Sequence, residues 1–112
     1  MAAGKHNIII DQGSDFAEDY VIKENGVVKD LTGYTARAQM RATKSSSTIS
    51  ATFTCTIATP ANGSINMSLG HALSSALTPG KFYWDIEIYT AGEASVTRLL
   101  QGEALLTTEV TR

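Results

Sequence analysis

The sequence predicts an all-β fold, an antiparallel β-sandwich or related barrel of about seven to eight short strands. Three observations support this prediction. Apolar and polar residues alternate along most of the chain, which is the pattern of strands with one buried face. Turn-forming residues separate these stretches at intervals of roughly 8–12 residues. No alternation of strands with long helices supports a parallel sheet instead.

The composition is that of a single folded domain spanning residues 1–112. Hydrophobic residues make up 43% and charged residues 18%, which is typical of a globular chain. The net charge of -2 and the absence of a Lys/Arg run argue against nucleic acid as a partner. The apolar run "III" near the N-terminus is too short for a signal peptide or for a membrane span of about 20 residues. We therefore expect a soluble protein with no membrane partner.

The central part of the chain predicts a β-hairpin. Residues 49–57, "ISATFTCTI", alternate strictly, and "SINMSL" at residues 64–69 repeats the pattern after the turn sequence "PANG". Cys55 falls on the apolar parity, so we expect a buried and unreactive thiol. As the only cysteine it excludes an intramolecular disulfide. The residues expected to face the core are Ile49, Ala51, Phe53, Cys55, Ile57, Ile65, Met67 and Leu69.

The N-terminal half predicts three further strands. "FAEDYVIK" precedes the turn "ENG", whose Asn-Gly pair suits positive backbone φ angles, and "VVKDL" follows as a short strand. "YTARAQMR" then alternates small and apolar residues with a polar set, and "ATKSSST" at residues 42–48 is a polar loop. The polar set on this strand consists of Arg37, Gln39 and Arg41.

The C-terminal half combines one helical turn with the longest strands. "GHALSSALTPG" contains good helix formers followed by a proline, which predicts a short helical turn near residues 71–77. "KFYWDIEIY" directs Phe82, Trp84, Ile86 and Ile88 to one face. "SVTRLLQG" and "EALLTTEV" follow, and Gly102 between them predicts a bulge or a bend. Their inward residues are expected to include Ala104, Leu106 and Val110.

The residues do not assemble a catalytic or metal site. The acidic stretch "DQGSDFAED" has a faint likeness to a calcium loop, but the third ligand and the closing glutamate are missing, so a solvated turn is the better interpretation. Two isolated histidines do not make a metal site. We expect Asp85, Glu87 and Arg98 to form cross-strand surface pairs. The sequence thus predicts no catalytic residue, no metal and no cofactor.

Four stretches together carry a resemblance to a known group of proteins. They are "IDQGSDF", "DLTGYTARAQMR", "ALTPGKFYWDIEI" and "VTRLLQGEALLTTEVTR", in this order. The chain resembles small virion structural proteins of tailed bacteriophages that have an immunoglobulin-like or related β-sandwich. It is also similar to the N-terminal domain of phage baseplate upper proteins. The resemblance covers residues 7–112, but the fibrous or helical continuation of a baseplate upper protein is absent from this sequence.

The resemblance implies a non-enzymatic subunit, an accessory or adaptor protein of the tail, neck or baseplate. Its partners would be other phage virion proteins, with a homo-oligomer in the assembled particle and synthesis in the host bacterial cytoplasm. A capsid decoration protein on the phage head is the main alternative. A glycan-binding module of a host-recognition apparatus is a second alternative. A small glycan hydrolase would require two carboxylates placed across a cleft.

Two segments are candidates for a protein interface. Residues 1–7 form a candidate N-terminal arm, and Ile8, Ile9 and Ile10 behind it form a strand that pairs either within its own domain or with a neighbour. Tyr83 and Tyr89 point away from the core on the strand that carries Trp84, and Arg98 is expected nearby. Outward aromatic and arginine side chains are enriched at interfaces, although strand propensity alone also explains the tyrosines.

Overall fold

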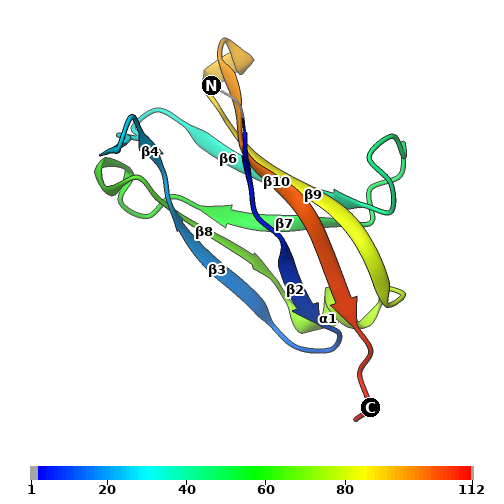
Figure 1. Ribbon diagram of the computed structural model, residues 1–112. Helices are drawn as coiled ribbons and strands as arrows, with labels where there is room; N and C mark the ends of the chain where they lie inside the picture. The colour runs from blue at the N-terminus through cyan, green and yellow to red at the C-terminus, as the bar shows by residue number, and fades with distance from the viewer. Residues whose placement is uncertain (1–2, 112) are drawn as a thin grey trace.

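A computed structural model describes residues 3–111 as an all-β sandwich, which confirms the predicted fold class (Figure 1). The helical turn predicted near residues 71–77 is also present, as the short helix α1. The strands are β1 (Gly4–Lys5), β2 (Ile8–Asp11), β3 (Phe16–Val21), β4 (Lys23–Glu24), β5 (Val27–Val28), β6 (Thr35–Arg41), β7 (Ala51–Thr56), β8 (Ser64–Leu69), β9 (Gly80–Tyr89) and β10 (Val96–Thr107), with α1 at His71–Ser75 and 3-10 turns at Pro60–Asn62 and Ala91–Glu93.

One curled sheet supplies both layers of the sandwich. Its strand order is β1-β10-β9-β6-β7-β8-β3, and β2 also pairs with β10. Strand β7 connects the layers, because Ala51–Phe53 pair with β6 whereas Thr54–Thr56 pair with β8. The predicted hairpin of β7 and β8 is confirmed, with Cys55 opposite Met67. The predicted "ENG" turn closes the small β4–β5 hairpin, where Asn25 and Gly26 both have positive φ.

The N-terminal strands pair within their own domain and run parallel to β10, although the sequence predicted an antiparallel sheet throughout. Ile8 and Ile10 are 2% and 0% exposed and belong to the core, so their assignment to a candidate interface is wrong. Only Ile9 between them is exposed, as the alternation of a strand requires. Of the candidate arm, Gly4 and Lys5 pair with Leu100 and Gln101, and its first two residues lie outside the described part of the chain.

The core follows the period-two pattern wherever a regular strand carries it. Every second residue of β8 and β9 is buried, including Trp84, Ile86 and Ile88. The pattern fails beyond strand ends: Ile49 is 44% exposed because β7 begins at Ala51, and Val110 is 89% exposed because β10 ends at Thr107. Both were expected in the core, and both lie outside.

Cys55 is only partly buried, not fully buried as expected, and its surroundings still raise the pKa of the thiol to about 11. The cause is desolvation of the thiolate. A thiol with this pKa is almost entirely protonated at neutral pH, which agrees with the unreactive cysteine that the sequence predicts.

Strand β10 runs without interruption from Val96 to Thr107 and Gly102 pairs in regular register with Trp84, so the bulge or bend predicted at Gly102 is wrong. The irregularity falls earlier, where the register with β9 shifts between Arg98 and Leu100. Leu99 is the extra residue of this bulge, which changes the parity of the strand, so that Leu99 and Ala104 are both buried. Gly102 has a different role, since a Cβ atom there would overlap the carbonyl oxygen of His6 in the adjacent N-terminal segment. Among the described residues, none of the helices is long and apolar enough to cross a membrane.

Candidate functional site

The outward face of strands β6, β9 and β10 carries a regular array of polar side chains. The strands are paired so that residues from all three lie in rows across the sheet. Because alternate residues of a strand face the same side, successive rows are two residues apart on β6 and β9; on β10 the bulge makes the step from Arg98 to Gln101 three residues. The three central rows are Arg37–Glu87–Arg98, Gln39–Asp85–Gln101 and Arg41–Tyr83–Glu103.

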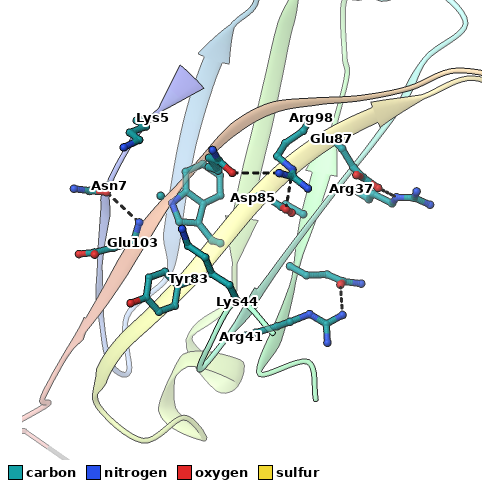
Figure 2. Close-up of a pocket in the computed structure, with 15 residues that line it drawn as sticks. Lys5, Asn7, Arg37, Arg41, Lys44, Tyr83, Asp85, Glu87, Arg98 and Glu103 are labelled. Carbon is teal, nitrogen blue, oxygen red and sulfur yellow. Dashed lines mark hydrogen bonds and ion pairs between the residues drawn. The ribbon is translucent and has the colours of Figure 1, made fainter. Parts of the chain in front are cut away.

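A broad hollow of about 710 Å³ lies over these rows (Figure 2). The N-terminal segment borders it with Lys5 and Asn7, and Lys44 reaches it from the polar loop that follows β6. The side-chain oxygen of Asn7 accepts a hydrogen bond from the backbone N–H of Glu103 at 3.0 Å, which fixes this border to β10. Lys44 and Tyr83 lie together in the same part of the hollow.

Arginines hold both central carboxylates of β9. Arg37 donates hydrogen bonds to Glu87 and, at 2.7 Å, to Glu93, and these carboxylates raise the pKa of the guanidinium. Arg98 Nε lies 3.3 Å from Asp85 Oδ2. Burial nevertheless raises the pKa of Asp85, and the positive charge of Arg98 opposes that shift. The predicted cross-strand pairing of Asp85 and Arg98 is confirmed.

Three other cations at the hollow have no carboxylate partner among the described residues: Lys5, Arg41 and Lys44. Arg41 donates to the carbonyl of Ser46 at 2.9 Å and to the side-chain oxygen of Gln39 at 3.1 Å, both neutral acceptors. Lys44 Nζ lies 5.5 Å from the centre of the Tyr83 ring. At this end of the hollow Arg41 and Lys44 thus lack a direct carboxylate contact, while Glu103 in the same row pairs with Lys81.

The structure places Tyr83, Tyr89 and Arg98 on this outward face, as the sequence predicted. Tyr83 and Arg98 line the hollow. Tyr89 lies one row beyond it, where the Arg37 guanidinium is 4.4 Å from the centre of its ring. Ile9 lies at the edge of the same sheet beside Leu105, and both are exposed. Ile8 and Ile10 do not join this surface.

Sequence reasoning missed the residues of β6 and the loop after it as part of the site. The outward parity of β6 was visible in the sequence as Arg37, Gln39 and Arg41. Its place beside β9 was not visible, because 38 or more residues separate the two strands in the chain and only the register brings them together. Lys44 lies in a loop without periodicity, and no pattern in the sequence indicates that it reaches Tyr83.

The acidic segment at residues 11–19 forms a second charged region. It comprises the end of β2, the turn to β3 and much of β3, and the turn lies at the same end of the molecule as α1 (Figure 1). Asp15 accepts hydrogen bonds from the backbone N–H of His71 at 2.8 Å, and His71 Nδ1 lies 2.9 Å from the same oxygen. The backbone bond is the main reason that the pKa of Asp15 is lowered, and the His71 side chain adds to it.

Buried Ser74 of α1 ties the turn in this segment to the helix. Its hydroxyl accepts from the backbone N–H of Gly13 at 3.1 Å and lies 3.0 Å from the carbonyl oxygen of Ser14, to which it donates. Gln12 adds a hydrogen bond from its side-chain amide to the carbonyl of Leu77 at 3.0 Å. Within residues 3–111, no group of three or more His, Cys, Asp or Glu side chains is placed to hold a metal ion.

Comparisons with known proteins add little to this description. No protein-family model matches the chain, and no curated protein matches it. Among solved structures, it is similar to a family 123 glycoside hydrolase from Clostridium perfringens whose structure concerns glycolipid glycan hydrolysis. The identity is 12% and the TM-score 0.47, over 97% of this chain and 24% of the enzyme. The chain thus spans about a quarter of that enzyme, and the likeness is too distant to bear on its function.

Proposed function

We propose that the protein is a non-enzymatic structural subunit of a tailed-phage virion, which works through protein–protein contacts made by the face of β6, β9 and β10. One observation carries this proposal. All three arginines that the structure describes, Arg37, Arg41 and Arg98, line one hollow together with Tyr83. Arginine and tyrosine are enriched at protein interfaces and among the residues that dominate binding energy.

The resemblance to phage virion proteins involves the same three strands and supports the proposal that their outward face makes the contact. Three of its four sequence stretches contain β6, β9 and β10, and the fourth is the turn from β2 to β3. These are also the strands that present the polar rows of the hollow. The proposal therefore rests on both the sequence resemblance and the surface chemistry.

The arrangement of the carboxylates supports binding more than hydrolysis. Asp85 and Glu87 lie on one strand, and each is held by an arginine. Glu103, on the neighbouring strand, pairs with Lys81 at 3.7 Å. A glycosidase needs one carboxyl group free to donate a proton and a second placed across the bond to be cut. These groups act instead as anchors for the cations of the face.

We place the protein in the virion, as an accessory or adaptor subunit of the tail, neck or baseplate. Such subunits are arranged symmetrically, so each copy meets its neighbours through the same surfaces. A capsid decoration protein uses the same kind of contact on the head. The two positions differ in symmetry, because tail components form rings whereas decoration proteins follow the icosahedral shell.

The direct test is protein mass spectrometry on purified particles of the phage that encodes this chain. We expect the protein among the virion components, in particles made with wild-type protein and in particles made with Lys23→Glu protein. Lys23 lies on β4, away from the hollow. The double variant Tyr83→Ala/Arg98→Ala should fold but be lost from the particles at least about tenfold, because it removes two interface anchors. Absence of the wild-type protein from particles would refute the proposal.

Glycan binding is a second candidate function, and the hollow itself favours it. Tyr83 lies among the side-chain amides of Asn7, Gln39 and Gln101, and planar aromatic and amide groups are common in ligand pockets. NMR titration of the labelled protein with host cell-wall oligosaccharides separates the two functions. Shifts confined to the hollow and saturating with one glycan would support this candidate against the structural role.

A further inference from the structure

The charge of the molecule is distributed unevenly between the hollow and the rest of the surface. Five cationic and three anionic side chains line the hollow, a net charge of +2, while the whole chain carries -2. The remainder of the molecule therefore carries -4. Part of this negative charge is concentrated in the acidic segment at residues 11–19, which holds four carboxylates within nine residues.

The acidic segment keeps carboxylate oxygens available for a partner. Asp11 accepts from the Thr107 hydroxyl, Asp15 from His71 and Asp19 from the Asn66 amide, and in each case the described residues engage only Oδ1. All three side chains are exposed. Among the described residues none of them has a lysine or arginine partner. Glu18 differs, because it turns toward His6 and Tyr20.

The hollow offers the complementary groups. Lys5, Arg41 and Lys44 lack carboxylate partners among the described residues. Lys5 lies at the N-terminal border of the hollow, whereas Arg41 and Lys44 lie at the end that contains Tyr83. An aspartate brought to this end would complete charge-assisted hydrogen bonds that the isolated chain leaves open. Lys44 is already held near the Tyr83 ring, and the aspartates already accept hydrogen bonds within their own chain. Both partners are therefore partly ordered before they meet, which lowers the entropy lost on binding.

We propose that the hollow of one copy binds the acidic segment of a second copy of the same chain. This inference rests on the proposed function, since it names the partner of the contact face. The second copy is preferred because both halves of the contact are present on this chain, with opposite charge. The two surfaces are different, so the contact is head-to-tail, and repeated contacts of this kind close into a ring or continue as a filament.

The test is sedimentation velocity of the full chain over a concentration range up to about 1 mM, the range in which weak self-association becomes visible. We expect association that strengthens with concentration and weakens when salt is raised from about 0.02 M to about 0.5 M, because exposed charges are screened. Wild-type protein that stays monomeric over the whole range at low salt would overturn the proposal.

Two variants assign the contact to its two surfaces. Lys5→Glu/Lys44→Glu alters the hollow, and Asp11→Lys/Asp19→Lys alters the acidic segment. Each variant alone should weaken self-association at least about tenfold, the size expected when contacting charges become repulsive. Lys23→Glu/Lys29→Glu is the control for the hollow variant, because it makes the same change in net charge away from both surfaces. It should change the dissociation constant by less than about threefold.

Mixing two neutral variants distinguishes a head-to-tail contact from a symmetric one, whereas charge-reversed surfaces would attract each other again. The Lys5→Ala/Lys44→Ala chain keeps its acidic segment and the Asp11→Ala/Asp19→Ala chain keeps its hollow, so a 1:1 mixture should form a heterodimer and no larger species. Unchanged self-association of the Asp11→Lys/Asp19→Lys chain would show that another surface occupies the hollow and would overturn the proposal. Binding of a uronic-acid oligosaccharide in the hollow without self-association would also overturn it.

The outcomes separate this inference from the proposed function. If mass spectrometry finds the protein in particles while the purified chain and its variants stay monomeric, the inference fails and the virion role stands. If the protein is absent from particles, the virion role fails whatever the purified chain does.

Discussion

At the scale of single residues, two small residues determine how the N-terminal segment and the acidic segment are held. Gly102 allows the N-terminal segment to run in close contact beside β10, with the indole N–H of Trp84 donating to the carbonyl of His6 at 2.9 Å. Ser74 is the one buried polar side chain of α1 and connects that helix to the turn that follows β2. Both residues position neighbouring backbone, so substitutions there test the packing directly.

Replacing Gly102 with alanine should destabilise the protein by about 1–3 kcal/mol, the usual cost of overpacking a close contact. The added Cβ would overlap the His6 carbonyl, and the N-terminal segment would have to move off β10. Urea unfolding followed by Trp84 fluorescence measures the change. Gly70→Ala is the matched control, since nothing lies within 4 Å of its Cβ position, and it should change the free energy of unfolding by less than about 1 kcal/mol. Equal effects at the two positions would contradict the close approach of the His6 carbonyl to Gly102.

Replacing Ser74 with alanine should cost about 1–3 kcal/mol, because the backbone N–H of Gly13 loses its buried acceptor. The exposed neighbour Ser75 provides the control, since its hydroxyl makes no hydrogen bond to any residue within 3–111 and Ser75→Ala leaves its backbone carbonyl in place. Chemical denaturation of the two variants gives the comparison. A Ser74→Ala protein as stable as Ser75→Ala would mean that the turn is not anchored through this hydroxyl.

The pH dependence of Asp15 tests the contact between the acidic turn and α1. Its pKa is lowered from 3.8, so the ionised carboxylate favours the folded state above that pH, and this contribution is lost as the pH falls through the folded-state pKa. NMR titration of the Asp15 carboxyl carbon should give a midpoint below 3.8. In His71→Ala the midpoint should rise only in part, because the backbone N–H is the larger cause. A midpoint of 3.8 or above in wild type would rule out the contact.

At the scale of strands, the N-terminal pairing decides which residues are free for assembly. Strand β2 adds to β10 in parallel, with Ile8 opposite Ala104 and Ile10 opposite Leu106. Its inward side chains complete the core, and its outward Ile9 lies beside Leu105. A strand that completes its own domain in this way is a structural element first, and only its outward face is available to a neighbour.

Alanine substitutions along β2 test this assignment. Ile8→Ala and Ile10→Ala should each destabilise the protein by about 2–5 kcal/mol, as expected for cavities at buried isoleucines. Ile9→Ala should cost less than about 1 kcal/mol, because its side chain is 64% exposed. Thermal unfolding of the three variants under one condition provides the measurement. If Ile9→Ala were more destabilising than Ile8→Ala and Ile10→Ala, then β2 would either turn its other face to the core or leave the domain in solution.

A strand was predictable from the sequence where its own residues alternate between apolar and polar. Phe82, Trp84, Ile86 and Ile88 alternate without a break, and β9 buries all four. The bulge of β10 was not predictable, because Leu99 and Ala104 stand on opposite parities and only the register with β9 explains why both are buried. The local residue pattern predicts which face of a strand is buried, but it does not predict which strands pair with it.

The candidate site was less predictable than the strands for the same reason. Tyr83, Tyr89 and Arg98 were expected to point outward, and they do. The hollow between them depends on β6 lying beside β9 and on Lys44 reaching over Tyr83, and both are long-range contacts. Charge pairing adds a further condition, since Arg37 and Arg41 look equivalent in the sequence but only Arg37 has carboxylate partners.

At the scale of the whole molecule, the curled sheet presents a positively charged hollow on one layer and an acidic segment that begins where β2 ends (Figure 1). A domain with an uneven charge distribution is suited to oriented contacts, because opposite charges favour one relative orientation of two copies over others. This is the property that a symmetric subunit of a particle requires. The central claim is therefore that the face of β6, β9 and β10 is covered by protein in the assembled virion.

The most direct test of this claim is a cryo-electron microscopy map of the phage particle at a resolution that shows side chains. We expect symmetric copies of the domain on the tail, neck, baseplate or head, each with Tyr83, Arg98 and Lys44 covered by a neighbouring protein. A covering acidic segment at residues 11–19 would identify that neighbour as a second copy. A particle without this domain, or with the hollow open to solvent in every copy, would contradict the account.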